Sequence, residues 1–122
     1  MAEALIIDDN RSTADALSEM LTVLGFQSRV AYGSSAAMSI LGSGFTPYFI
    51  FLDLNMPGVA GTEILAFLRR EPRLIRVPVV IVTSDDQPET RSRVLRMGAT
   101  AIVIKPATIE SLEAALKKTR IL

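Results

Sequence analysis

Four short apolar runs of the chain each end at a residue type that can bind or react with a phosphoryl group. These runs and the residues after them are Leu5 to Ile7 before Asp8 and Asp9, Phe49 to Leu52 before Asp53, Val79 to Val82 before Thr83, and Ile102 to Ile104 before Lys105. If the runs are parallel strands of one sheet, their carboxyl ends lie along a single edge, where ligands of open α/β sheets bind. The sequence therefore predicts a site with three carboxylates, one hydroxyl and one ammonium group.

This set of groups is suited to phosphoryl chemistry that depends on a metal ion. Carboxylates gathered at one edge repel one another, and without a cation some of them would stay protonated. Mg²⁺ prefers oxygen ligands and is commonly shared between one or two carboxylates and a phosphate. A carboxylate can also attack phosphorus to form an aspartyl phosphate, and Asp53 is the candidate nucleophile. The Lys105 ammonium and the Thr83 hydroxyl would then compensate the charge of the transferred group.

Amphipathic segments lie between the apolar runs and predict the helices that position the site. Residues 11–24 place apolar side chains on one helical stripe, and Gly25 is a typical helix stop. A short strand is expected at residues 27–32. Further helices are expected after a cap at Ser34 or Ser35, around residues 64–68, around residues 89–97, and after a cap at Thr108.

The resulting order of elements is (βα)5, which we interpret as one domain over residues 1–122. The third and fourth strands are almost continuously apolar, as expected of strands covered on both faces. Right-handed crossovers of this length favour an α/β fold with a doubly wound five-stranded parallel sheet in the flavodoxin-like strand order 2-1-3-4-5.

Composition excludes several classes of function. The chain has 13 basic and 13 acidic residues, so its zero net charge gives no overall attraction to nucleic acid or anionic membranes. It has no cysteine and no histidine, which excludes disulfides, zinc sites of the Cys/His type and Ser-His-Asp or Cys-His catalysis. No apolar run approaches the roughly 18 residues of a membrane span, and no secretory leader opens the chain. We expect a cytoplasmic location.

Longer motifs surround the polar residues. They are Asp8-Asp9, Asp53-Leu54-Asn55-Met56-Pro57-Gly58 with Gly61, Thr83-Ser84, Gly98-Ala99 and Lys105-Pro106. Singly, each has an ordinary structural explanation, since Asp9 or Asn10 can cap the first helix and Thr83-Ser84 can form a turn. In this order, over essentially the full chain, they resemble the receiver domain of two-component response regulators, including the stand-alone chemotaxis type.

The resemblance implies a role for each acidic residue. Asp53 corresponds to the phosphoacceptor, which takes its phosphoryl group from the phosphohistidine of a sensor kinase or of a histidine phosphotransfer domain. Asp9 and Asp53 correspond to direct Mg²⁺ ligands, and Asp8 to a ligand acting partly through water. Asn55 would add its backbone carbonyl.

The resemblance also implies how the signal is produced. Thr83 corresponds to a hydroxyl that moves towards the phosphoryl group, and Lys105 to the cation that pairs with it, in a cis peptide with Pro106. Such a domain catalyses its own phosphorylation and dephosphorylation but is not a conventional enzyme. Its altered surface binds a downstream protein, and no direct contact with nucleic acid or membrane is expected.

Two departures from the family pattern bear on the output. Ile102 and Ala107 stand where the family often has aromatic residues, so an alternative is an interaction module that works without phosphorylation. A phosphohydrolase is a weaker alternative, because such enzymes place a second Asp where this chain has Asn55. We also expect Asn55 and Asp85 to flank the approach of the hydrolytic water and to set the lifetime of the phosphorylated form.

Overall fold

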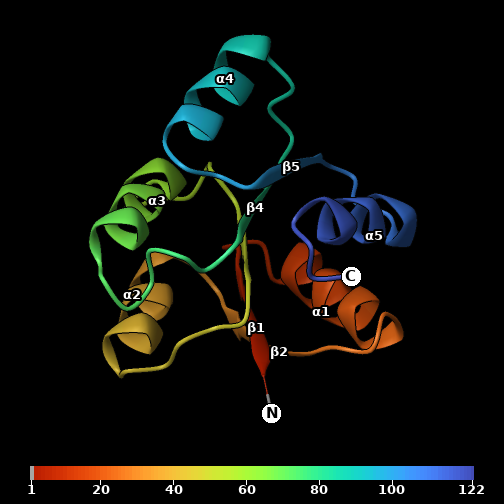
Figure 1. Cartoon of the computed structure of the whole chain (residues 1–122), viewed down its shortest axis with the longest axis horizontal. Helices are drawn as coiled ribbons and strands as arrows, with labels where there is room; N and C mark the ends of the chain where they lie inside the picture. Colours follow the sequence, from red (N-terminus) through yellow and green to blue (C-terminus); the bar gives the residue numbers. More distant parts are fainter. Residues whose placement is uncertain (1) are drawn as a thin grey trace.

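The computed structural model describes residues 2–122, which form a five-stranded sheet with helices on both faces (Figure 1). The strands are β1 (Glu3–Ile7), β2 (Gln27–Ala31), β3 (Ile50–Leu52), β4 (Val79–Thr83) and β5 (Ala101–Ile104). The helices are α1 (Arg11–Val23), α2 (Ser34–Gly42), α3 (Gly61–Arg70), α4 (Pro88–Arg96) and α5 (Ile109–Lys118). All neighbouring strands are parallel, in the order β2-β1-β3-β4-β5, which confirms the predicted fold.

The sheet separates two apolar clusters. Helices α1 and α5 cover one face, and α2, α3 and α4 cover the other (Figure 1). Successive residues around β3 point to opposite faces, as the pleat of a strand requires. Ile50 and Leu52 therefore pack in the cluster with α2, α3 and α4, whereas Phe49 and Phe51 pack in the cluster with α1 and α5. Because both faces are covered, all three residues of β3 and all five of β4 are buried, and the strand ends are held firmly.

Two predicted helix caps are present. The Asn10 side chain accepts a hydrogen bond from the Thr13 N–H at 2.9 Å and caps α1. Thr108 caps α5 in a reciprocal arrangement with Ser111, in which each side chain accepts a bond from the other residue's N–H. These caps satisfy amide groups that the first turn of a helix leaves without an internal partner.

The predicted cap of α2 is wrong. Gly33 occupies the cap position with φ of 113°, a conformation that side chains other than glycine rarely adopt, and it places Ser34 inside the first turn. The Ser34 hydroxyl instead bridges to the loop after β3. It lies 3.3 Å from the Pro57 carbonyl, to which it donates, and accepts from the Val59 N–H at 3.2 Å.

Helix α4 is less buried than the other helices. Val94 is its only buried residue, because most of the other positions carry polar or charged side chains. Its packing therefore depends strongly on how its first turn is joined to β4. None of the helices in residues 2–122 combines the length and the apolar character needed to cross a membrane.

Candidate functional site

The carboxyl ends of β1 and β3 bring three acidic side chains together, as predicted. Asp8 and Asp9 follow β1, and Asp53 follows β3, its direct neighbour in the sheet. One carboxylate oxygen from each residue lies within 4.8 Å of the others. Asp8 and Asp53 are only 1% and 5% exposed, whereas Asp9 is open to solvent. The acidic cluster of Asp8, Asp9 and Asp53 is therefore buried at two of its carboxylates and open to solvent at the third.

Lys105 completes this cluster from the edge of the sheet. Its ammonium nitrogen lies 3.0 Å from Oδ2 of Asp8 and 3.6 Å from Oδ1 of Asp53. Because β3 and β4 separate β5 from β1, the lysine must reach across the carboxyl edge to make these contacts. The peptide bond between Lys105 and Pro106 is cis, as the resemblance implies.

The electrostatic balance of the cluster is unfavourable for an ionised Asp53. Burial raises the pKa of the Asp53 carboxyl group, the nearby ammonium of Lys105 lowers this pKa, and the charges of Asp8 and Asp9 raise it again. The Asn55 N–H, 3.5 Å from Oδ1 of Asp53, has a smaller lowering effect. The net direction is upwards, because burial has the largest effect on this pKa and outweighs the ammonium group of Lys105.

The donor set fits a hard divalent cation. The three carboxylates supply only oxygen atoms, which Mg²⁺ prefers over softer ligands. A cation would also lower the pKa of the Asp53 carboxyl group, which burial raises most and the charges of Asp8 and Asp9 raise further. Asn55 lies exposed in the loop that follows Asp53, and its backbone carbonyl is the further candidate ligand that the resemblance implies.

Thr83 is placed at the same edge by β4. In the register of β3 and β4, Leu52 pairs with Ile81, so Asp53 and Thr83 follow at the same end of adjacent strands. Thr83 is 1% exposed, and its hydroxyl oxygen accepts the Asp85 N–H at 3.2 Å. Because this oxygen accepts a bond, the proton of the hydroxyl stays free to donate to another group.

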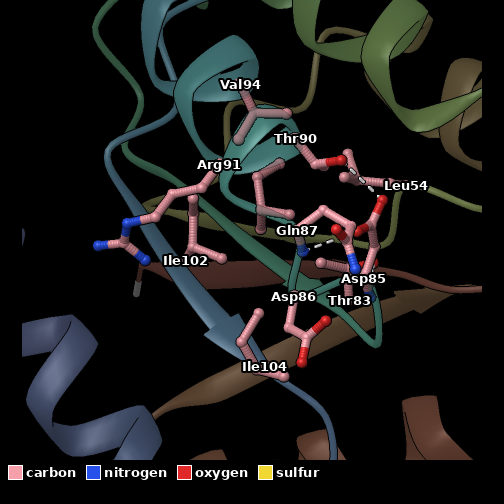
Figure 2. A pocket seen from close by; sticks show the side chains of 11 residues that line it. Leu54, Thr83, Asp85, Asp86, Gln87, Thr90, Arg91, Val94, Ile102 and Ile104 are labelled. Atoms are coloured by element: carbon pink, nitrogen blue, oxygen red, sulfur yellow. Dashed lines mark hydrogen bonds between the residues drawn. The ribbon is translucent and has the colours of Figure 1, made fainter.

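A small cavity of about 70 Å³ lies between β4, β5 and the start of α4 (Figure 2). Its lining includes Thr83, Thr90, Val94 and Ile102. Ile102 is half-buried and packs against the apolar cluster of α2, α3 and α4. The space next to Thr83 is therefore bordered by an aliphatic side chain.

The Asp85 carboxylate is bound to the start of α4. It accepts the Gln87 N–H at 3.0 Å through Oδ1 and the Thr90 hydroxyl at 2.7 Å through Oδ2 (Figure 2). The bond from the Gln87 N–H, followed by the bond from Thr90, lowers the pKa of the Asp85 carboxyl group. The predicted role of Asp85 beside the hydrolytic water would require this carboxylate to leave its partners on α4.

Sequence reasoning missed three contacts around the site. A Cβ atom on Gly61 would collide with the carbonyl oxygen of Asp53 and lie 2.7 Å from the Leu54 Cα, so the start of α3 can approach the loop after β3 only with glycine there. The hydrogen bond from Thr90 to Asp85 and the bonds between Ser34 and the loop after β3 were also missed. Asp85 and Gln87 follow a common pattern in which an Asp bonds the N–H two residues on. No sequence signal identifies Thr90 or Ser34.

Comparisons with known proteins identify the family of this chain. A model of the response regulator receiver domain matches residues 4–117. The chain belongs to this family. As a receiver domain of two-component response regulators, it has the fold that solved structures of the family share.

Individual relatives cover nearly the whole receiver domain. The chemotaxis protein CheY of Pseudomonas aeruginosa is 30% identical over 115 residues, which is 93% of this chain and 92% of that protein. The sensory transduction protein RegX3 of Mycobacterium tuberculosis is 32% identical, and the match covers 96% of this chain but 50% of RegX3. The structure of CheY4 of Vibrio cholerae has a TM-score of 0.88 and 27% identity, with 100% of this chain and 99% of that one covered.

Proposed function

We propose that Asp53 is the phosphoacceptor of this receiver domain. Its phosphoryl group would come from the phosphohistidine of a sensor histidine kinase or of a histidine phosphotransfer domain. The observation that carries the proposal is the convergence of Asp53 with Asp8, Asp9 and Lys105 at the carboxyl edge of the sheet. Burial of several charged groups lowers the stability of a folded protein unless their charges are compensated, as a bound cation would do here.

The chemical step is a transfer between two nucleophiles. A carboxylate oxygen of Asp53 forms a bond to phosphorus, while the bond from phosphorus to the imidazole nitrogen breaks and its electron pair leaves with the nitrogen. Charge on the phosphoryl oxygens is compensated by the Lys105 ammonium, and the free proton of the Thr83 hydroxyl can be donated to one of them. Asp53 must be ionised to attack, which its raised pKa opposes.

Mg²⁺ is part of the proposal. Asp8, Asp9 and Asp53 would hold it through carboxylate oxygens, and Asn55 through its backbone carbonyl. When bound, it compensates negative charge on the carboxylates and on the phosphoryl oxygens. The raised pKa of Asp53 supports this assignment, because a nearby cation favours the ionised form.

The receiver domain, residues 1–122 in this proposal, acts as a switch and not as an enzyme on external substrates. It promotes only its own phosphorylation and dephosphorylation and presents a changed surface to a protein target in the cytoplasm. The complete set of Asp8, Asp9, Asp53 and Lys105 gives no support to a module that works without phosphorylation. Asn55 two residues after the acceptor argues against a phosphohydrolase, which turnover of an external phosphate ester would reveal.

Phosphoryl labelling tests the proposal directly. The chain is incubated with acetyl phosphate and Mg²⁺, and the intact mass is measured. We expect one added phosphoryl group on the wild type and none on Asp53→Asn. Asp86→Asn is the matched control, because Asp86 is an exposed acidic residue of the loop after β4. A wild type that takes no label, or label that persists on Asp53→Asn, would contradict the assignment.

A further inference from the structure

Three hydrogen bonds connect Thr83 to the first turn of α4. The Thr83 hydroxyl accepts the Asp85 N–H at 3.2 Å. The side chain of the same Asp85 accepts the Thr90 hydroxyl at 2.7 Å and the Gln87 N–H at 3.0 Å (Figure 2). Asp85 therefore connects Thr83 at the site to Thr90 on the helix.

These three bonds lie where they can transmit a conformational change from Thr83 to α4. Asp85 sits near the N-terminus of α4, where a negative charge is favoured by the helix dipole. Apart from Val94, every residue of α4 is at least partly exposed, so apolar packing holds this helix only weakly. The link to Asp85 is thus a substantial part of what fixes the start of α4.

Movement of Thr83 would act on this link. In the proposed function the Thr83 hydroxyl donates to the phosphoryl group on Asp53, and the cavity of about 70 Å³ beside it leaves room for rearrangement. When the hydroxyl turns, the Asp85 N–H must follow it or lose its acceptor. In the first case the carboxylate bound to Thr90 moves as well, and in the second the connection between Thr83 and the first turn of α4 is broken.

We propose that Thr90 is a positioning residue that couples Thr83, through Asp85, to the conformation of α4. This inference rests on the proposed function, since phosphorylation of Asp53 supplies the movement. Thr90 contacts neither phosphorus nor Asp53 and is not a catalytic residue. It fixes the direction of the Asp85 carboxylate and so determines how far a change at Thr83 reaches the surface.

The test compares amide chemical shifts before and after addition of beryllium fluoride with Mg²⁺, which together mimic an aspartyl phosphate. In the wild type we expect shifts both around Asp53 and along α4. In Thr90→Val, which keeps the shape but loses the hydroxyl, the shifts around Asp53 should persist while those of α4 fall about fivefold. Thr90→Ser, which restores a hydroxyl, should recover the α4 response.

Controls separate this inference from the proposed function. Ser92→Ala changes an exposed hydroxyl on the same helix and should leave the α4 response at the wild-type level. Asp85→Ala removes the link from its other end and should match Thr90→Val. A full α4 response in Thr90→Val and Asp85→Ala would overturn the inference alone. Absence of any shift around Asp53 in the wild type would overturn the proposed function and the inference together.

Discussion

The two sides of the site differ in how tightly they are built. On the acidic side, Asp8 and Asp53 follow the strands β1 and β3, and their carboxylates are almost fully buried against Lys105. On the opposite side, β4 and β5 enclose a small cavity, and the loop after Thr83 leads to a helix with one buried residue. The acidic side is fixed by the core, whereas the loop after the buried strand β4 and the start of α4 are held largely by hydrogen bonds.

This difference suggests a division of work within one edge of the sheet. Phosphoryl transfer needs groups held in place before the reaction, because reorganisation during the step is costly. A response needs an element whose alternative conformations differ little in free energy. The acidic cluster and Lys105 are held rigidly, as phosphoryl transfer requires, whereas α4 is weakly packed, as a conformational response requires.

Truncation of a core residue should have the largest effect on stability. Leu52, which precedes Asp53, is fully buried, and Leu52→Ala should lower the free energy of unfolding by about 2–5 kcal/mol through lost burial and a new cavity. Leu95→Ala on α4, where the side chain is 38% exposed, should cost less than about 1 kcal/mol. Urea denaturation measures both. Equal decreases in the free energy of unfolding would contradict the proposed difference in packing between the two sides of the site.

Removal of the ammonium group should impair labelling more than folding. Lys105→Met takes away the cation beside Asp53 and the phosphoryl oxygens, and the initial rate of labelling by acetyl phosphate should fall about 100-fold. Lys117→Met, at an exposed position of α5, is the matched control and should label at the wild-type rate. A Lys105→Met variant that is folded and labels normally would show that the rigid side does not depend on this charge.

Removal of the buried charge of Asp53 should stabilise the fold. Asp53→Asn removes a buried charge and should raise the free energy of unfolding at neutral pH by about 1 kcal/mol. Because the pKa of Asp53 is raised in the folded state above its ordinary 3.8, the wild type should lose stability relative to this variant as pH rises from about 4 through the folded pKa. Denaturation in Mg²⁺-free buffer at several pH values measures this. A constant difference between the proteins across that range would be inconsistent with the raised pKa.

The smallest effects are expected at the two residues that flank the acceptor. Asn55→Ala should change the dephosphorylation rate roughly fivefold, or about 1 kcal/mol, because Asn55 is exposed directly beside Asp53. Asp85→Ala should change it less, about twofold, because the Asp85 carboxylate is bonded to α4. Decay of the labelled protein after removal of the donor measures both rates. Unchanged decay in both variants would refute the assigned roles.

The sequence predicts most of the fold and the membership of the acidic cluster. Each apolar run ends where a buried strand ends, so the topology alone brings Asp8, Asp53 and Lys105 to one edge. The predicted ends of strands differ from the observed ends by a residue or two. The sequence predicts that the third strand begins at Phe49, for example, whereas β3 begins at Ile50. Strand identity depends on hydrophobic patterning, which is local, but exact ends depend on hydrogen bonds to neighbouring strands.

Side-chain partners could not be predicted in the same way. The predicted cap at Ser34 was wrong because the left-handed conformation of Gly33 moves the helix start, and this conformation is set by the surrounding loops. The bond between Thr90 and Asp85 likewise depends on the path of the loop after β4. Polar side chains have several partners within reach, and tertiary structure selects among them.

The ion pair between Asp8 and Lys105 joins residues 97 positions apart in the chain. An intermediate that has formed only β1 to β3 has Asp53 and its acidic neighbours but lacks this ammonium group. During synthesis, therefore, competence to accept a phosphoryl group should arise only when the final strand has docked.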